Sequence, residues 1–123
     1  VYALLDFEDT AEFENATKGL LASPDTANPS LWRDTQLNHI YGLFEVTDGI
    51  YQVRGYDMSN VTFIKGDTGW IVVDPLMSVE CAQAALALVE ENLGTFPVKA
   101  VIYSHSHIDH FGGVKGIVSE EEV

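Results

Sequence analysis

Three of the four histidines in this 123-residue chain fall within six positions, together with an aspartate. The four side chains are His105, His107, Asp109 and His110. Side chains two residues apart on an extended segment project to the same side, so His105 and His107 can reach one metal ion at about 2.0 to 2.1 Å. Asp109 and His110 follow where the chain turns, and they offer an oxygen and a nitrogen to a second ion. The spacing predicts a site for two metal ions.

The surroundings of this cluster favour a metal over the alternatives, which are a histidine-rich surface loop or core histidines held by ordinary hydrogen bonds. The cluster directly follows an apolar segment, and α/β sheets place their sites at the ends of strands. We expect Gly112 and Gly113 to remove side chains where the backbone passes close to the metals. Imidazole and carboxylate donors, with the lone Cys81 far off in the sequence, favour zinc over iron or manganese.

The elements that must position the cluster come directly before it. Residues 98–103 are apolar on both faces, which predicts a strand in the middle of a sheet. Apolar residues recur at three and four positions between 79 and 93, which predicts an amphipathic helix. Ser78 is its expected N-cap, and Gly94 is expected to end it in the left-handed αL conformation.

Further upstream the pattern predicts a β-meander. Residues 43–46 and 50–54 are strand candidates around Asp48-Gly49, a strong hairpin signal. Residues 61–65 and 70–73 repeat the arrangement around a turn that contains two glycines. Asp74-Pro75 should end the last of these strands, because proline supplies no hydrogen-bond donor to the sheet.

The N-terminal third has a different character. Asp9 and Glu12 have the spacing of a capping box, which predicts a short helix over residues 9–19. Residues 23–29 are rich in Ser, Pro, Asp and Asn and predict a loop. Ser30 is expected to cap a second short helix that runs to residue 40.

The motif His-x-His-x-Asp-His after a buried strand resembles the signature of the metallo-β-lactamase superfamily. The resemblance implies that His105 and His107 bind the first of two zinc ions and that Asp109 and His110 bind the second. It also implies that Asp74, at the end of an earlier strand, braces the metal loop, although a turn or helix-capping aspartate is the alternative. The implied fold is an α+β, αββα sandwich of which only the N-terminal half is present.

A narrower resemblance lies upstream. Residues 28–33, 42–46, 50–55 and 60–62 are similar to the linear alkyl and aryl sulfatases of that superfamily. This implies hydrolysis of alkyl sulfate esters to alcohol and sulfate by a metal-bridged hydroxide, with Asp109 as a metal ligand that also handles a proton. Family resemblance further implies a homodimer of the full-length protein and a periplasmic or secreted location.

Two other functions stay open. One is another hydrolase of the superfamily, such as a thioesterase, lactonase or β-lactamase, and the other is a non-catalytic metal-binding module. Four ligands cannot complete two shells, since a catalytic zinc takes about three protein ligands and keeps an open position. We therefore expect a fragment that is inactive alone, with residues 1–41 as an extension and 42–123 as the first half of the catalytic domain. The chain also looks shorter than the family between Leu21 and Pro24.

Composition limits the partners. Nineteen acidic against six basic side chains give a net charge of −13, which argues against nucleic acid. No apolar run approaches the roughly 20 residues that span a bilayer. An anionic sulfate ester would meet the same repulsion, so a local cation must bind it. Arg54 and Lys65 are candidates to attract an anionic head group, although basic residues near strand ends are usually solvated.

Overall fold

The structure is a computed structural model that describes residues 22–121. In chain order its helices and strands are α2 (Pro29–Leu37), β1 (Gly42–Thr47), β2 (Ile50–Arg54), β3 (Val61–Lys65), β4 (Trp70–Val73), α3 (Val79–Leu93) and β5 (Val98–Ile102). Two short 3-10 turns follow, Ile108–His110 and Val114–Gly116. The helix expected over residues 9–19 lies outside the described residues.

The four meander strands form where the sequence predicted them. β1 and β2 join through a two-residue turn, with Thr47 opposite Ile50. Gly49 takes a φ of 73° there, which is the positive φ that an Asp-Gly hairpin turn requires. The bounds of β2, β3 and β4 are those predicted, and β1 is one residue longer at each end.

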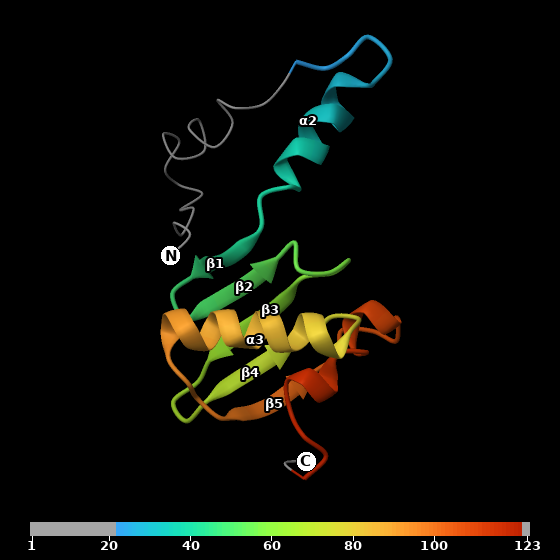
Figure 1. The fold of residues 1–123 in the computed structure, drawn as a ribbon. Coiled ribbons are helices and arrows are strands. Elements are labelled where there is room, and N and C mark those ends of the chain that lie inside the picture. The colour runs from blue at the N-terminus through green and yellow to red at the C-terminus, as the bar shows by residue number, and fades with distance from the viewer. Residues whose placement is uncertain (1–21, 122–123) are drawn as a thin grey trace.

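One mixed sheet contains all five strands in the order β1-β2-β3-β4-β5 (Figure 1). The first four are antiparallel neighbours, whereas β5 runs parallel to β4. A parallel pair needs a crossover, and α3 provides it. As a result the carboxyl ends of β4 and β5 lie side by side.

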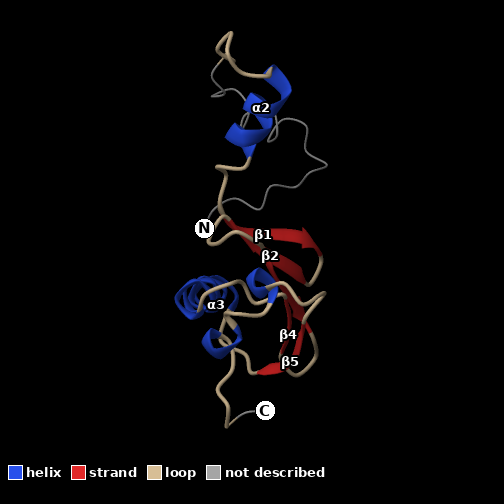
Figure 2. Ribbon diagram, turned by 90° about the vertical axis from the view of Figure 1, so that its right-hand side faces the viewer, coloured by secondary structure: helices blue, strands red, loops and turns tan. Residues whose placement is uncertain are grey.

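Helix α3 and both 3-10 turns lie on one side of the sheet (Figure 2). The core lies between α3 and that face, and the residues that form it are Leu43, Val53, Val61, Phe63, Trp70, Val72, Leu76, Ala82, Ala85, Val89 and Ile117. Trp70 is fully buried and makes edge-on ring contacts with Tyr51, Phe63 and Phe96. This layer fixes the ends of β4 and β5, from which the histidine cluster projects.

The prediction of a central final strand does not hold within the part of the chain that the structure describes. Within residues 22–121, β5 pairs only with β4 and forms an edge of the sheet. Lys99 and Ala100 are exposed, and Ile102 is 49% exposed. The residues of β5 are mostly apolar, but in the described part of the chain α3 covers only one of the two faces of the sheet.

Two predicted helix ends were also wrong. Helix α2 ends at Leu37 and begins after Asn28, whose side chain accepts hydrogen bonds from the backbone N–H groups of Ser30 and Leu31. Asn is as good a cap as Ser, and it leaves Pro29 in the first turn, where proline is favoured. Gly94 does end α3 with a positive φ of 92°, but its ψ of 159° is extended and not αL. Ser78 caps α3 as predicted.

Candidate metal centre

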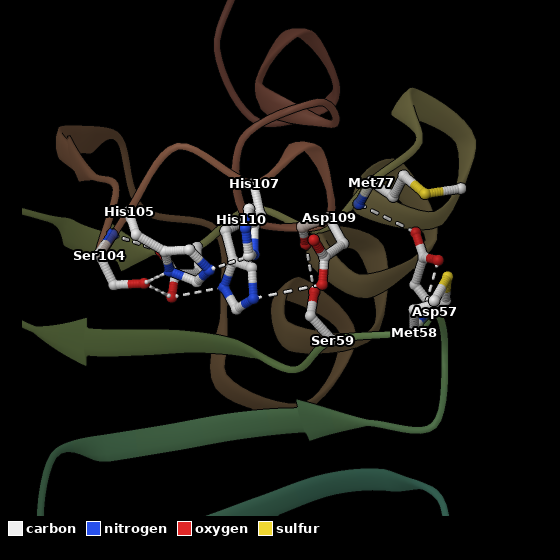
Figure 3. A network of polar contacts seen from close by, with 10 residues as sticks. Asp57, Met58, Ser59, Met77, Ser104, His105, His107, Asp109 and His110 are labelled. Atoms are coloured by element: carbon white, nitrogen blue, oxygen red, sulfur yellow. Dashed lines mark hydrogen bonds and ion pairs between the residues drawn. The ribbon is translucent and has the colours of Figure 1, made fainter.

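The predicted site residues come together at the carboxyl ends of two neighbouring parallel strands. Asp74 directly follows β4, and residues 104–110 follow β5. The backbone N–H of Asp74 donates to the carbonyl oxygen of Ile102 over 2.9 Å, which ties the two strand ends together. Figure 3 shows the cluster that results, with Ser104, His105, His107, Asp109 and His110 side by side.

His105 and His107 form the first donor pair. Nε2 of His105 lies 3.1 Å from Nδ1 of His107, and the ring centroids are 4.6 Å apart. Two nitrogens bound to one tetrahedral zinc at the usual bond length lie about 3.3 Å apart. The separation of this pair is therefore close to what a shared ion requires.

Asp109 and His110 form the second pair. Oδ2 of Asp109 lies 3.2 Å from Nε2 of His110, again close to the separation of two ligands on one ion. The rings of His105 and His110 are 4.1 Å apart between centroids, so the two pairs are neighbours. The donor set, three imidazoles and one carboxylate, suits zinc.

Asp74 lies behind both pairs as a hydrogen-bond acceptor. Its Oδ1 accepts from the backbone N–H of Ser104 over 2.7 Å. Its Oδ2 accepts from the Ser104 hydroxyl over 2.6 Å and lies 2.9 Å from Nδ1 of His110. The proton of His110 on Nδ1 is thereby fixed, which leaves Nε2 as the bare nitrogen that a metal needs.

The charge and backbone of Asp74 reflect this position. Burial acts to raise the pKa of the Asp74 carboxyl, but the hydrogen bonds from Ser104 and His110 outweigh it and hold the pKa below its usual range. Asp74 has a φ of 55°, and Leu76 two residues on has a φ of 63°. Positive φ is uncommon outside glycine, although aspartate tolerates it, and three hydrogen bonds to the carboxylate hold this residue there.

The two glycines after the cluster allow close packing of the backbone against the segment before α3, and their expected approach to the metals stays a prediction. A side chain on Gly112 would collide with the carbonyl oxygen of Met77, and one on Gly113 with the carbonyl oxygen of Pro75. Gly113 also donates its N–H to the carbonyl of Leu76 over 3.0 Å. The glycines therefore let the metal loop pack against the segment before α3, and their closest contacts are with that segment.

Two residues that sequence reasoning did not single out support the loop from the connection between β2 and β3. The hydroxyl of Ser59, a buried polar residue, donates to the backbone carbonyl of Asp109. The carboxylate of Asp57 accepts from the N–H group of Met77 over 3.0 Å (Figure 3). It also accepts from the N–H group of Ser78 over 3.2 Å. These contacts link residues far apart in the sequence, so no local pattern indicated them.

Lys65 and Arg54, the candidates to attract an anionic head group, lie at different places on the sheet. Lys65 pairs with Trp70 at the start of β4, the opposite end of the strand from Asp74, and its ammonium lies over the ring of Phe96. Arg54 lies over the ring of Phe44 and donates from Nε to Gln52 over 2.7 Å. Lys65 therefore lies at the opposite end of β4 from the predicted ligands.

Each donor pair offers two of the roughly three protein ligands of a catalytic zinc. Among the residues that the structure describes, no group of three or more histidine, cysteine or acidic side chains converges closely enough to hold an ion. The role of His105, His107, Asp109 and His110 as metal ligands thus stays a prediction that their pairwise geometry fits.

Residues 54–123 match the model of the metallo-beta-lactamase superfamily. The chain belongs to this superfamily. The matched residues include Asp74 and all four predicted ligands. In structure the chain is similar to the stereoselective inverting sec-alkylsulfatase Pisa1 from Pseudomonas sp., with a TM-score of 0.79 and 51% identity over 89% of this chain and 18% of that one. The predicted fold, part of a metallo-β-lactamase domain, is confirmed.

Curated relatives extend the similarity beyond the superfamily match. The chain is 60% identical over 102 residues to a linear primary-alkylsulfatase of Pseudomonas sp., which covers 83% of this chain and 15% of that protein. It is 45% identical to an alkyl/aryl-sulfatase of Saccharomyces cerevisiae over 147 positions, 97% of this chain and 23% of the yeast protein. The predicted resemblance to alkyl sulfatases is confirmed.

The chain spans less than a quarter of the length of each of these proteins. The alignment with the yeast protein is also longer than the 123 residues of this chain, so the relative carries positions that have no counterpart here. This agrees with the expectation that the chain is shorter than the family.

Proposed function

We propose that the protein that carries this chain is a zinc-dependent alkyl sulfatase, which cleaves alkyl sulfate esters to an alcohol and sulfate. The observation that supports it most is the extent of the similarity. The superfamily match begins at residue 54, whereas the similarity to proteins named as alkylsulfatases covers 83% and 97% of the chain. The chain is therefore similar to sulfatases both in the metal loop and in the segments upstream of it.

The residues of the site have distinct proposed roles. His105 and His107 hold one zinc, and Asp109 and His110 hold the second. When bound, zinc supplies the Lewis acidity that makes water nucleophilic near neutral pH and offsets charge on the ester oxygens. Asp74 fixes the ring of His110 through Nδ1. Asp109, whose side chain is 28% exposed, is also the proposed group for handling a proton.

The charge of the chain supports a metal at the point where an anionic ester binds. A net charge of −13 repels a sulfate ester at long range. Lys65 lies at the opposite end of β4 from Asp74. The guanidinium of Arg54 lies over the ring of Phe44. Two divalent ions would supply a cationic surface at the donor pairs.

A substrate panel on the longest purified protein that carries this sequence tests the proposal. We expect release of sulfate from dodecyl sulfate, loss of this activity with a chelator, and its return when zinc is added. A lactone and a thioester of similar chain length are the matched comparison, since other hydrolases of the superfamily would act on these. Hydrolysis of either one with no action on dodecyl sulfate would contradict the proposal.

Three broader expectations accompany it. We propose a homodimer, which light scattering on the purified protein tests, and a periplasmic or secreted location, which cell fractionation tests. The division into residues 1–41 and 42–123 stays a proposal as well. Within residues 22–121 no helix is both long enough and apolar enough to span a membrane.

A further inference from the structure

We propose that Ser104 is a positioning residue, which connects the carboxylate of Asp74 to His105 and so selects the ring nitrogen that His105 presents to His107. The inference rests on the proposed metal centre, because a metal ligand must present an unprotonated nitrogen. It gives a role to the residue directly before the motif, for which the sequence alone indicated none.

The surroundings of Asp74 set the direction of its hydrogen bond with the Ser104 hydroxyl. Asp74 is surrounded by donors: the N–H of Ser104 at 2.7 Å, the hydroxyl of Ser104 at 2.6 Å, and Nδ1 of His110 at 2.9 Å. A carboxylate with three such neighbours acts as the acceptor toward each. The single proton of the Ser104 hydroxyl is therefore donated to Oδ2 of Asp74.

The Ser104 hydroxyl also contacts the ring of His105. Oγ of Ser104 lies 2.9 Å from Nδ1 of His105. Because the only hydroxyl proton already points to Asp74, Oγ can only accept at this contact, and Nδ1 of His105 must carry the proton. The other nitrogen, Nε2, is then bare, and it is the one that lies 3.1 Å from Nδ1 of His107. Ser104 thus sets the tautomer that metal binding requires.

Asp74 is connected to one histidine of each donor pair. Asp74 reaches His110, in the second pair, directly through Nδ1. It reaches His105, in the first pair, through the hydroxyl of Ser104. In both histidines Nδ1 is held and Nε2 faces the partner of the pair. One carboxylate therefore orients one ligand of each proposed ion, and Figure 3 shows Ser104 beside His105 at one end of this network.

A purely structural role for Ser104 predicts something different. Its backbone N–H alone could join the end of β5 to Asp74, and that bond survives any side-chain change. Only the proposed role makes the hydroxyl matter to the first pair and not to the second. The variants S104A, which removes the hydroxyl, and S104T, which keeps it, separate these cases. Ser106 is exposed and lies between the two histidines, so S106A is the matched control.

Zinc affinity measured by competition with a chromophoric chelator, on the longest purified protein, is the first readout. Loss of a hydrogen-bond partner behind a ligand typically weakens metal binding by about 10- to 100-fold. We expect S104A to weaken the binding of one of the two zinc ions by this factor and to leave the affinity for the other unchanged. S104T and S106A should have the zinc affinities of the wild type. Equal affinities in S104A and wild type would overturn the proposal, and so would equal losses in S104A and S104T.

The tautomer of His105 in metal-free protein is the second readout, and it does not depend on zinc. Long-range 1H–15N correlation distinguishes the protonated ring nitrogen from the bare one, and H105Q identifies the signals of this residue. We expect the proton on Nδ1 in wild type and S104T, and its loss from Nδ1 in S104A. A proton on Nε2 in the wild type would overturn the role of Ser104. A wild type that binds no zinc would sink the proposed function, and the tautomer would then decide this inference alone.

Discussion

At the scale of single residues, the site depends on how a few donors are oriented. The two pairs have donor separations of 3.1 and 3.2 Å, and Asp74 holds the opposite side of one ring in the second pair. The types and local spacing of His105, His107, Asp109 and His110 were enough to predict these four as ligands, whereas Asp74, 30 residues before Ser104, was implied only by the family resemblance. The sequence was not enough to assign Ser104, since its hydroxyl acquires a role only when β4 and β5 lie side by side.

Asp74→Asn tests the residue that both pairs share. An amide of the same size offers one acceptor oxygen and one donor in place of two acceptors, so it cannot satisfy all three donors around it. We expect both ions to bind about 10- to 100-fold more weakly than in the wild type, as judged by chelator competition. Asp57→Asn is the matched control, because Asp57 accepts only backbone N–H groups and contacts no histidine. Wild-type zinc affinity in the Asp74 variant would rule out its proposed role.

At the scale of elements, the metal loop is held by close packing against the segment before α3. Gly113 lies so near the carbonyls of Pro75 and Ser78 that any side chain must displace backbone. We expect Gly113→Ala to destabilise the protein by about 1 to 3 kcal/mol through overpacking, measured as a lower midpoint of thermal unfolding. Gly66→Ala, in a turn where the nearest atom is 3.1 Å from the new carbon, should cost less. Equal midpoints for the Gly113 variant and the wild type would contradict this packing.

Element prediction succeeded where the signal is local and failed where it depends on neighbours. The bounds of β2, β3 and β4 follow from alternating apolar residues and glycine turns, which short windows contain. The contact of Ser59 with Asp109 spans 50 residues, and that of Asp57 with Met77 spans 20, so neither could be read from the sequence. β5 was placed in the middle of a sheet because its composition fits two covered faces, but only one is covered within residues 22–121.

At the scale of the whole molecule, the sheet carries α3 and the two 3-10 turns on one side, while α2 lies apart from it (Figure 2). It belongs to a superfamily whose model it matches over residues 54–123, and it covers 15% to 23% of the alkylsulfatases reported above. Two donors per ion are available in the described residues, against the roughly three that a catalytic zinc takes. A complete site therefore needs ligands in addition to these four, and the test of metal binding belongs on the longest protein that carries the sequence.

The number of zinc ions per chain, measured by mass spectrometry on that protein, tests the central claim most directly. We predict about two in the wild type, since two donor pairs are present, each with the spacing of a shared tetrahedral ion. We predict about one in His107→Ala, because this change removes a donor from the first pair only. A folded wild type with no zinc, or a His107 variant that keeps two ions, would contradict the account.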